Sequence, residues 1–390
     1  MRRRILVAVP VALALGLGLA AYARRDDLAR IRAVLSLFDE NRIVWNFSHM
    51  AEIFPSVSMH APIHAPSPLP RAPVGATMPE GFATWVAERR VTSALVMRDG
   101  EVAFEEYYLG TGPDDLRISW SLAKGFLGTL TGLSLENGEI ASIDDAVTKY
   151  APELIGTAYD GATIRNVLNL ATGVEFDEDY GRFWSDINRL GRLLALGGSL
   201  DEFVAGFDTR WADPGFAYHY VSIDTHVLGM VLRGATGRRI PELMNERLFT
   251  PLKLDADPVF LTDTTGNAFV LGGLNLTTRD YARFAQMLLE NGRAGGEQVV
   301  PATWIEQMQR PSAPYGPGRE NGGGYGYNWR IPPDPKPGEF FALGVFGQYL
   351  WIDQGAGVVV VITSVDPDSE SGDNKESSIA MLRAIVEEVR

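Results

Sequence analysis

Runs of β-branched and apolar residues on either side of short turns predict β-strands near both ends of the chain. Residues 91–97 and 102–108 are rich in β-branched and apolar side chains and flank an Asp-Gly pair, which is typical of a β-hairpin. Residues 348–353 and 358–363 flank a glycine-containing turn in the same way. The sequence therefore predicts one hairpin toward each end of the chain.

Helical periodicity dominates the segment between the two hairpins. Apolar residues recur every three or four positions in residues 165–170, 225–233 and 282–289, and again in residues 375–389 at the C-terminus. Strands at both ends with helices between them indicate an α+β fold, in which one sheet is built from both chain ends and a helical region is inserted into it.

Residues 1–23 have the composition of an export signal or a membrane anchor. Three arginines precede an uncharged stretch over residues 5–23, and residues 21–23 (Ala-Tyr-Ala) have the form of an export cleavage site. As a helix this stretch would be about 28 Å long, close to the hydrocarbon thickness of a bilayer. We therefore expect export, with the folded part either periplasmic after cleavage or held at the membrane through residues 5–23; a buried soluble helix is disfavoured because a terminal segment so apolar is hard to cover.

Residues 24–80 are predicted to be a linker or a strap over the surface. Seven prolines lie between positions 55 and 79, and proline at this density favours extended or turn backbone. The remaining residues, 81–390, are then predicted to contain the folded, function-bearing part of the chain.

Composition excludes several classes of protein. Hydrophobic residues make up 46% and charged residues 22% of the chain, which is ordinary for a globular protein. The net charge of −14 argues against nucleic acid or an anionic membrane surface as the main partner. Cysteine is absent, which excludes disulfides, thiolate nucleophiles and zinc-cysteine sites, and no HExxH, P-loop or GxSxG motif occurs. No metal or cofactor is predicted.

A hydrolase without cysteine or a recognisable Ser-His-Asp pattern needs another base, and the sequence Ser-Leu-Ala-Lys at residues 121–124 offers one. If a helix begins at Ser121, positions i and i+3 share a face, which places the Lys124 amine near the serine hydroxyl. A lysine accepts a proton only when it is neutral, and the apolar run that follows predicts the buried surroundings that favour this form. The alternative is an N-capped helix with a solvated lysine.

Two further elements carry candidate chemistry. Tyr220 and Ser222 precede the predicted helix 225–233, and a tyrosine hydroxyl beside a lysine can pass a proton from the serine to a leaving group. The alternative is a tyrosine in an ordinary turn. Tyr180 is a candidate pocket-lining residue, although an exposed acidic loop is the simpler interpretation.

The other element is the glycine-containing run at the entry to the C-terminal hairpin. Gly344 and Gly347 would let the strand backbone approach a ligand closely. The backbone N–H groups of Ser121 and Val345 could then form an oxyanion hole. The alternative is a strand with a bulge.

The order of these elements resembles the serine β-lactamase and penicillin-recognising superfamily, and more closely its class C-related branch of 6-aminohexanoate-dimer hydrolase-like serine hydrolases and bacterial esterases. Further matching segments run from residue 46 to the C-terminus: Asn46-Phe47, residues 53–55, 160–165, 272–274, 278–284 and Gly347-Gln348.

This resemblance implies a β-lactamase/transpeptidase-like fold, with an antiparallel sheet, flanking helices and an all-helical region at about residues 138–264. It implies that Ser121 is the acylated nucleophile, Lys124 its base and Tyr220 the proton relay. It also implies that the amides of Ser121 and Val345 form the oxyanion hole, and that a small-molecule ester or amide is the substrate.

The chain departs from the β-lactamase pattern at two places. Residues 342–344 (Ala-Leu-Gly) stand where β-lactamases have Lys-Thr-Gly, whose lysine receives a substrate carboxylate, and Ser222 replaces the usual asparagine. Both changes favour an esterase or short-amide hydrolase over a β-lactamase or DD-peptidase. A non-catalytic ligand-binding or sensing module of the same fold, and acyl transfer to another acceptor, remain alternatives.

Overall fold

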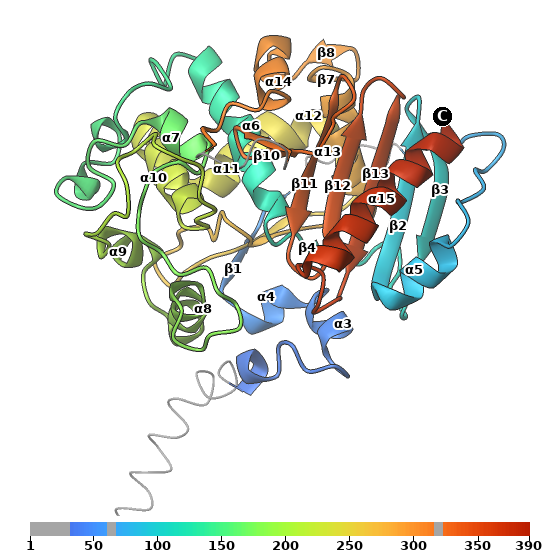
Figure 1. Cartoon of the computed structure of the whole chain (residues 1–390), viewed down its shortest axis with the longest axis horizontal. Helices are drawn as coiled ribbons and strands as arrows, with labels where there is room; N and C mark the ends of the chain where they lie inside the picture. Colours follow the sequence, from blue (N-terminus) through green and yellow to red (C-terminus); the bar gives the residue numbers. More distant parts are fainter. Residues whose placement is uncertain (1–31, 61–67, 316–322) are drawn as a thin grey trace, which may run out of the picture.

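The computed structural model describes residues 32–60, 68–315 and 323–390, and a seven-stranded antiparallel sheet lies at the centre of this part of the chain (Figure 1). The strand order is β3-β2-β13-β12-β11-β10-β9. The bounds are β2 (Val91–Arg98), β3 (Glu101–Tyr107), β9 (Gly324–Gly326), β10 (Trp329–Ile331), β11 (Glu339–Gly344), β12 (Gln348–Asp353) and β13 (Val358–Ser364). The two hairpins, β2–β3 and β12–β13, pair with each other through β2 and β13, which confirms the prediction of one sheet built from both ends of the chain.

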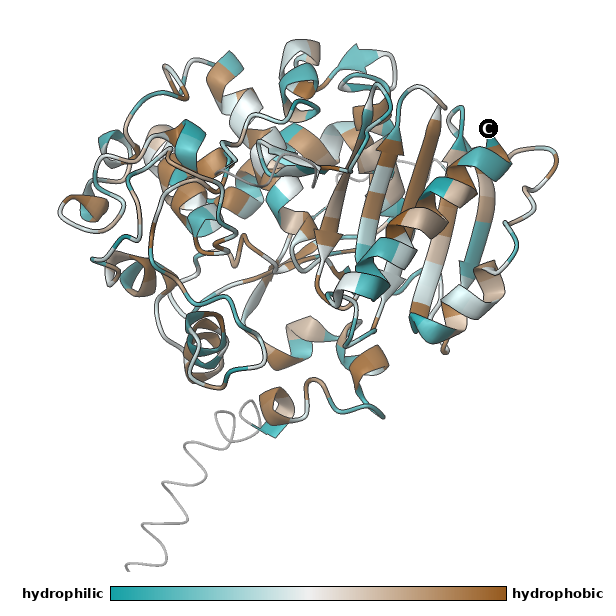
Figure 2. Ribbon diagram, in the orientation of Figure 1, coloured by the Kyte–Doolittle hydropathy of each residue, from teal (hydrophilic) through white to brown (hydrophobic). Residues whose placement is uncertain are grey.

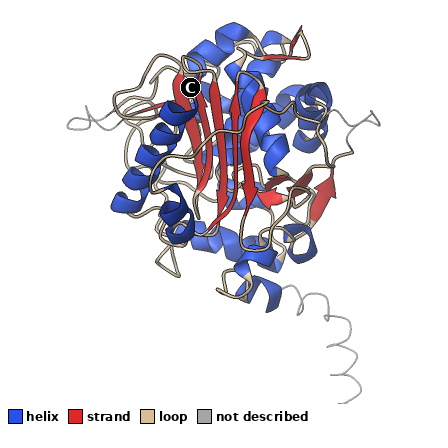
Figure 3. Ribbon diagram, turned by 90° about the vertical axis from the view of Figure 1, so that its right-hand side faces the viewer, coloured by secondary structure: helices blue, strands red, loops and turns tan. Residues whose placement is uncertain are grey.

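Helices cover both faces of this sheet, and its strands are therefore apolar on both sides. Alternate residues of β13 belong to different clusters: Val359 and Val361 face α6 (Leu122–Glu136) and α13 (Thr278–Leu289), whereas Val360 packs toward α5 and α15. Figure 2 shows the apolar colour running along the strands, and Figure 3 shows the sheet lying between the two helical layers. The covering helices of the second face are α5 (Phe82–Glu88) and α15 (Gly372–Val389), and α15 begins three residues before the predicted start at residue 375.

The remaining elements form the helical region and a smaller sheet beside it. The helices are α7 (Ile164–Leu168), α8 (Asp186–Leu196), α9 (Leu200–Ala205), α10 (Asp224–Thr236), α11 (Ile240–Met244) and α12 (Thr250–Leu252), with short turns η1 (Val147–Lys149), η2 (Pro152–Leu154) and η3 (Asn245–Phe249). The smaller sheet has the order β1 (Ser56–Ser58), β5 (Val259–Leu261), β6 (Leu274–Leu276), β4 (Arg117–Ile118). The hairpin β7 (Arg293–Ala294) and β8 (Glu297–Gln298) and the helix α14 (Ala302–Met308) complete the fold. The predicted helical range 138–264 thus contains six α-helices and, near its end, strand β5.

Part of the range 24–80, for which proline content predicted a linker or strap, is packed into the fold. Residues 43–58 form α3 (Ile43–Asn46), α4 (Met50–Ile53) and β1, which pairs with β5. Further along, the Val102 N–H donates to the carbonyl of Pro70 at 2.7 Å, so the chain there runs beside β3. The apolar stretch 5–23 lies outside the described residues; among the helices that are described, none has the length and apolar character needed to cross a membrane.

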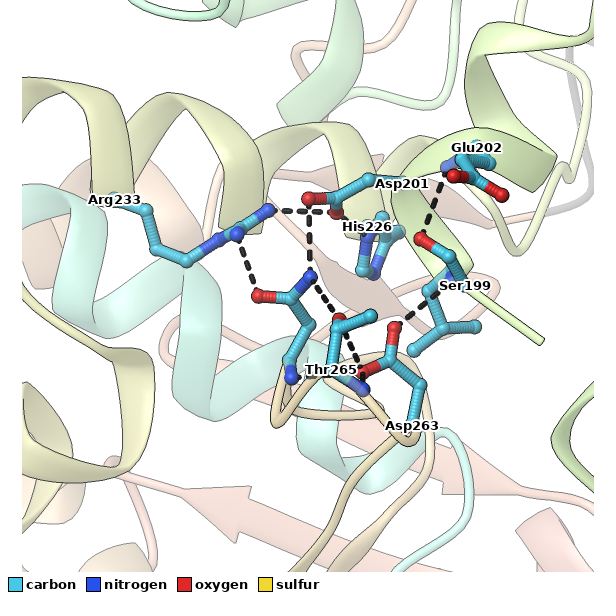
Figure 4. Close-up of polar contacts among 9 residues, drawn as sticks. Ser199, Asp201, Glu202, His226, Arg233, Asp263 and Thr265 are labelled. Carbon is cyan, nitrogen blue, oxygen red and sulfur yellow. Dashed lines mark hydrogen bonds and ion pairs between the residues drawn. The ribbon is translucent and has the colours of Figure 1, made fainter. Parts of the chain in front are cut away.

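A charged cluster joins α9, α10 and the loop after β5 (Figure 4). The Asp201 carboxylate accepts a hydrogen bond from Arg233 at 2.7 Å and from Asn267 at 3.0 Å, and it lies 2.7 Å from His226 Nε2. Burial raises the pKa of Asp201, but the neighbouring imidazole and guanidinium outweigh this effect and lower it to about 2. Asp263 accepts from the N–H of Leu200 at 2.9 Å and so fixes the start of α9.

Candidate active site

Ser121 lies immediately before α6, the helix that runs through the apolar core. Residues 122–134 of this helix are all buried, and Lys124 in its first turn is only 2% exposed. The Ser121 side chain makes no capping hydrogen bond to the helix. Both halves of the alternative interpretation, a capping serine and a solvated lysine, are therefore wrong.

Two of the predicted side chains, Lys124 and Tyr220, contact Ser121. Its Oγ lies 3.0 Å from Lys124 Nζ and accepts a hydrogen bond from the Tyr220 hydroxyl, also at 3.0 Å. Lys124 Nζ also lies 3.2 Å from the carbonyl of Leu271 and 3.4 Å from Ser222 Oγ. The Tyr220 ring stands beside the same amine, with its centroid 5.3 Å from Nζ. This arrangement can move a proton between a hydroxyl nucleophile, an amine and a phenol.

The end of β11 lies directly against the segment that precedes the serine. A Cβ on Gly344 would lie 2.7 Å from the Ser119 carbonyl, so this close approach requires glycine. Within the described ranges, neither the Ser121 N–H nor the N–H of Val345, which follows Gly344, has a hydrogen-bond acceptor. Two free donors on facing segments are what a developing oxyanion requires. Gly347, by contrast, has φ +82° and packs on Ser364, so it shapes the turn; substrate contact by either glycine stays a prediction.

Two bulky residues with left-handed backbone flank the candidate amide donors. Trp120 (φ +44°) precedes Ser121 and Phe346 (φ +64°) follows Val345, and their ring centroids are 6.0 Å apart. The fully buried Phe47 packs edge-on against both rings, at 5.5 Å and 5.1 Å. A left-handed φ is unfavourable for such side chains and persists only where packing enforces it. The N-terminal segment therefore contributes directly to the backbone geometry of the site.

Glu178 belongs to the site and was missed by sequence reasoning, because it stands in an acidic run that suggests a solvated loop. Its carboxylate accepts hydrogen bonds from the N–H of Ser222 at 2.9 Å, from Ser222 Oγ and from the Tyr180 hydroxyl at 3.0 Å. Burial raises the pKa of Glu178, and the positive charge of Lys124 opposes this shift. Tyr180 is 47% exposed, so its ring borders solvent while its hydroxyl turns inward. Contact of Tyr180 and Ser222 with substrate remains a prediction.

A second carboxyl group lies deeper, at the start of α10. Asp224 is fully buried and accepts hydrogen bonds from the hydroxyls of Tyr159 at 2.9 Å and Thr172 at 2.9 Å. Burial raises the pKa of Asp224 to about 8. No group of three or more His, Asp or Glu side chains placed to hold a metal ion occurs in the described part of the chain.

Comparison with known proteins assigns the class. A family model described as Beta-lactamase matches residues 83–382, and the chain therefore belongs to this family. Among its relatives, the 6-aminohexanoate-dimer hydrolase of Paenarthrobacter ureafaciens is 30% identical over 343 residues, which cover 84% of this chain and 86% of the relative.

Solved structures show the same fold. One from Bacillus anthracis, which provisionally carries the same hydrolase name, has a TM-score of 0.77 at 24% identity and covers 90% of this chain and 95% of its own. A family VIII carboxylesterase has a TM-score of 0.58 at 14% identity and covers 81% of this chain and 100% of its own. These findings confirm the family resemblance and the predicted β-lactamase/transpeptidase-like fold.

Proposed function

We propose that this chain is a serine hydrolase that cleaves an ester or a short amide through an acyl-enzyme on Ser121. The observation that carries this proposal is the convergence of Lys124 Nζ and the Tyr220 hydroxyl on one serine oxygen, each at 3.0 Å. Membership of a family with hydrolytic relatives supports it.

Acylation begins when neutral Lys124 takes the proton of Ser121 as Oγ bonds to the substrate carbonyl carbon. The N–H groups of Ser121 and Val345 stabilise the resulting oxyanion. The proton passes from the Lys124 ammonium through Tyr220 to the leaving oxygen or nitrogen as the carbonyl–leaving-group bond breaks. In the second half a water molecule attacks the ester, its proton returns along the same path to Ser121, and the acid is released. Glu178 positions Ser222 beside the lysine without touching the reacting atoms.

The test is labelling with a fluorophosphonate probe, followed by mass spectrometry of the labelled peptide. We expect the label on Ser121, its loss in Ser121→Ala, and full labelling in the control Ser377→Ala, an exposed serine of α15. Lys124→Met keeps the buried stem, and we expect it to remain folded by circular dichroism but to lose turnover of p-nitrophenyl esters. Labelling that survives Ser121→Ala, or turnover that survives Lys124→Met, would overturn the assignment.

Turnover distinguishes the remaining candidates. Hydrolysis of p-nitrophenyl esters or of a linear aminohexanoate dimer, with nitrocefin left intact, fits an esterase or short-amide hydrolase. Nitrocefin cleavage would indicate β-lactamase or DD-peptidase activity, and labelling without turnover of any of these would indicate a sensing module. When an alcohol or an amine is added as acceptor, formation of its acylated product would indicate acyl transfer in place of hydrolysis.

We also propose that the chain is exported and acts on its small-molecule substrate outside the cytoplasm. This proposal rests on the sequence of residues 1–23 alone. Cell fractionation of the full-length chain, with the N-terminus of the purified product sequenced, separates a cleaved signal from a retained anchor; recovery of the uncleaved chain in the cytoplasmic fraction would contradict it.

A further inference from the structure

A basic side chain outside the predicted site packs on the tyrosine of that site. Arg330 lies in the short strand β10, and its guanidinium carbon is 5.1 Å from the centroid of the Tyr220 ring. The hydroxyl of the same ring contacts Ser121 Oγ. Arg330 therefore lies one aromatic ring away from the nucleophile.

Arg330 is partly buried and forms no ion pair with the described part of the chain. Within the described ranges its guanidinium makes neither a hydrogen bond nor an ion pair, although it carries five N–H donors suited to a carboxylate. Arg247, which is also partly buried, shows the usual arrangement: Glu139 binds it with two hydrogen bonds of 2.6 Å and 2.7 Å. Withdrawing donors from water without a partner is unfavourable, so an unpaired arginine at this position is suited to bind an anion.

A second basic side chain lies near enough to Arg330 for their charges to interact. Lys375, in the first turn of α15, makes no ion pair within the part of the chain that is described, and burial together with the nearby charge of Arg330 lowers its pKa. The N-terminal end of this long helix adds its own positive partial charge. Glu370 is the carboxylate that acts on both cations, but it is exposed, so water screens it.

The segment that leads into α15 is fixed to the site by the backbone. The Asp366 N–H donates to the carbonyl of Phe346 at 3.1 Å, directly after the candidate oxyanion donor Val345. Ser369 packs near Gly347 in the same turn. Arg330 is thus an unpaired cation on the ring of Tyr220, and the Asp366 bond fixes the segment that leads into α15 beside the candidate oxyanion hole.

We propose that the substrate of this hydrolase carries a free carboxylate, which Arg330 binds through two N–H donors. The inference rests on the proposed function and names its substrate class: esters or amides with a carboxylate in the same molecule. The position differs from that of the Lys-Thr-Gly lysine of β-lactamases, which Ala342 occupies here.

Matched ester pairs test this inference through the ratio of kcat/KM between an anionic substrate and a neutral one. In the first pair, mono-p-nitrophenyl glutarate carries the carboxylate on its acyl group and p-nitrophenyl butyrate is the neutral substrate. In the second pair, 4-acetoxybenzoate carries the carboxylate on its leaving group and phenyl acetate is the neutral substrate. We expect a preference of about 10- to 100-fold for the anionic member of at least one pair, carried mainly by KM, as charge-assisted hydrogen bonds provide. Arg330→Gln should bring this ratio close to one, Arg330→Lys should restore part of it, and the exposed control Arg293→Gln should leave it unchanged.

The inference is overturned if the native chain shows a ratio near one for both pairs, or if Arg330→Gln does not lower the ratio. In either case, Ser121-dependent hydrolysis of the neutral esters would still support the proposed function. If neither an ester nor the linear aminohexanoate dimer is hydrolysed, the proposed function fails, and a binding measurement still decides whether Arg330 forms an anion site. Calorimetric titration of the Ser121→Ala chain with 6-acetamidohexanoate and with its neutral primary amide should show tighter binding of the carboxylate, and this difference should vanish when Arg330→Gln is added. Equal binding of the two ligands would refute the carboxylate site.

Discussion

Phe47 connects the N-terminal segment to the two backbone amides on which the proposed mechanism depends. Its buried ring contacts Trp120 and Phe346, the neighbours of Ser121 and Val345. Both neighbours hold a left-handed φ, which costs on the order of 1–3 kcal/mol for each bulky residue. Packing around Phe47 opposes that cost, so truncating this ring should affect stability and catalysis together.

The size of the effect follows from the contacts that are lost. Phe47→Leu keeps most of the apolar volume but removes three edge-to-face contacts, with Phe38, Trp120 and Phe346. Each is worth about 0.5–1.5 kcal/mol, so we expect a loss of about 1.5–4.5 kcal/mol in the free energy of unfolding. Phe47→Ala also opens a cavity and should cost about 3–5 kcal/mol. Because the flanking backbone is then free to relax, kcat for a p-nitrophenyl ester should fall more than KM rises.

Phe82→Leu is the matched control for this experiment. Phe82 is also buried and has an edge-on contact at 5.5 Å with Phe104 and a tilted one at 6.0 Å with Trp85, but it lies on the opposite face of the sheet. Urea unfolding should show a comparable loss of stability in both leucine variants, whereas only Phe47→Leu should lose kcat. If Phe47→Leu is destabilised and keeps the native kcat, the aromatic cluster does not hold the amides and this reasoning is refuted.

Three further predictions concern the scaffold around the site. Gly128→Ala should lower the free energy of unfolding in urea by about 1–3 kcal/mol, because its Cβ would lie 2.5 Å from the Tyr327 carbonyl. The control Gly191→Ala, which has open space around it, should raise the free energy of unfolding by about 0.5–1 kcal/mol. Equal changes in the two variants would contradict the close packing of α6. Asp201 has a pKa of about 2, since its imidazole and guanidinium partners outweigh the effect of burial; its contribution to stability is therefore full above about pH 4 and lost toward pH 2. Over this pH interval the melting temperature should change less with pH in Asp201→Asn than in the native chain (Figure 4). The same dependence of melting temperature on pH in both chains would count against a stabilising role of the charged cluster. Burial raises the pKa of Asp224 to about 8, so the native chain should lose stability as the pH rises from about 4 to 8. Asp224→Asn should lose less stability over this interval. If the free energy of unfolding in guanidinium chloride falls equally with pH in both chains, this prediction is wrong.

The sequence predicted those parts of the fold and site that depend on local pattern. Runs of β-branched and apolar residues around short turns predicted the two hairpins, and the spacing of Ser121 and Lys124 on an apolar helix predicted the amine beside the hydroxyl. Both inferences need only the geometry of one element and its burial. The family resemblance supplied what local pattern could not, namely the pairing of these residues with Tyr220.

The parts that the sequence did not predict arise from contacts between distant segments. Glu178 stands in an acidic run, and only the folded chain places it on Ser222, 44 residues later. Arg330 is one basic residue between an aromatic residue and a proline-rich loop, and no local pattern indicates that it will face Tyr220. Phe47 lies in a range whose proline content suggests a linker. For each of these, long-range packing decides the role of the residue.

Three kinds of unfavourable feature meet around Ser121, and their combination argues for chemistry over passive binding. Lys124 is withdrawn from water, the N–H groups of Ser121 and Val345 have no acceptor among the described residues, and Trp120 and Phe346 hold a strained backbone. Each feature destabilises the folded chain. A module that only bound its ligand could use an ordinary loop and a solvated lysine. Hydrolysis, in contrast, needs an amine that can exist without its proton, and donors already aimed at a charge that appears only in the transition state.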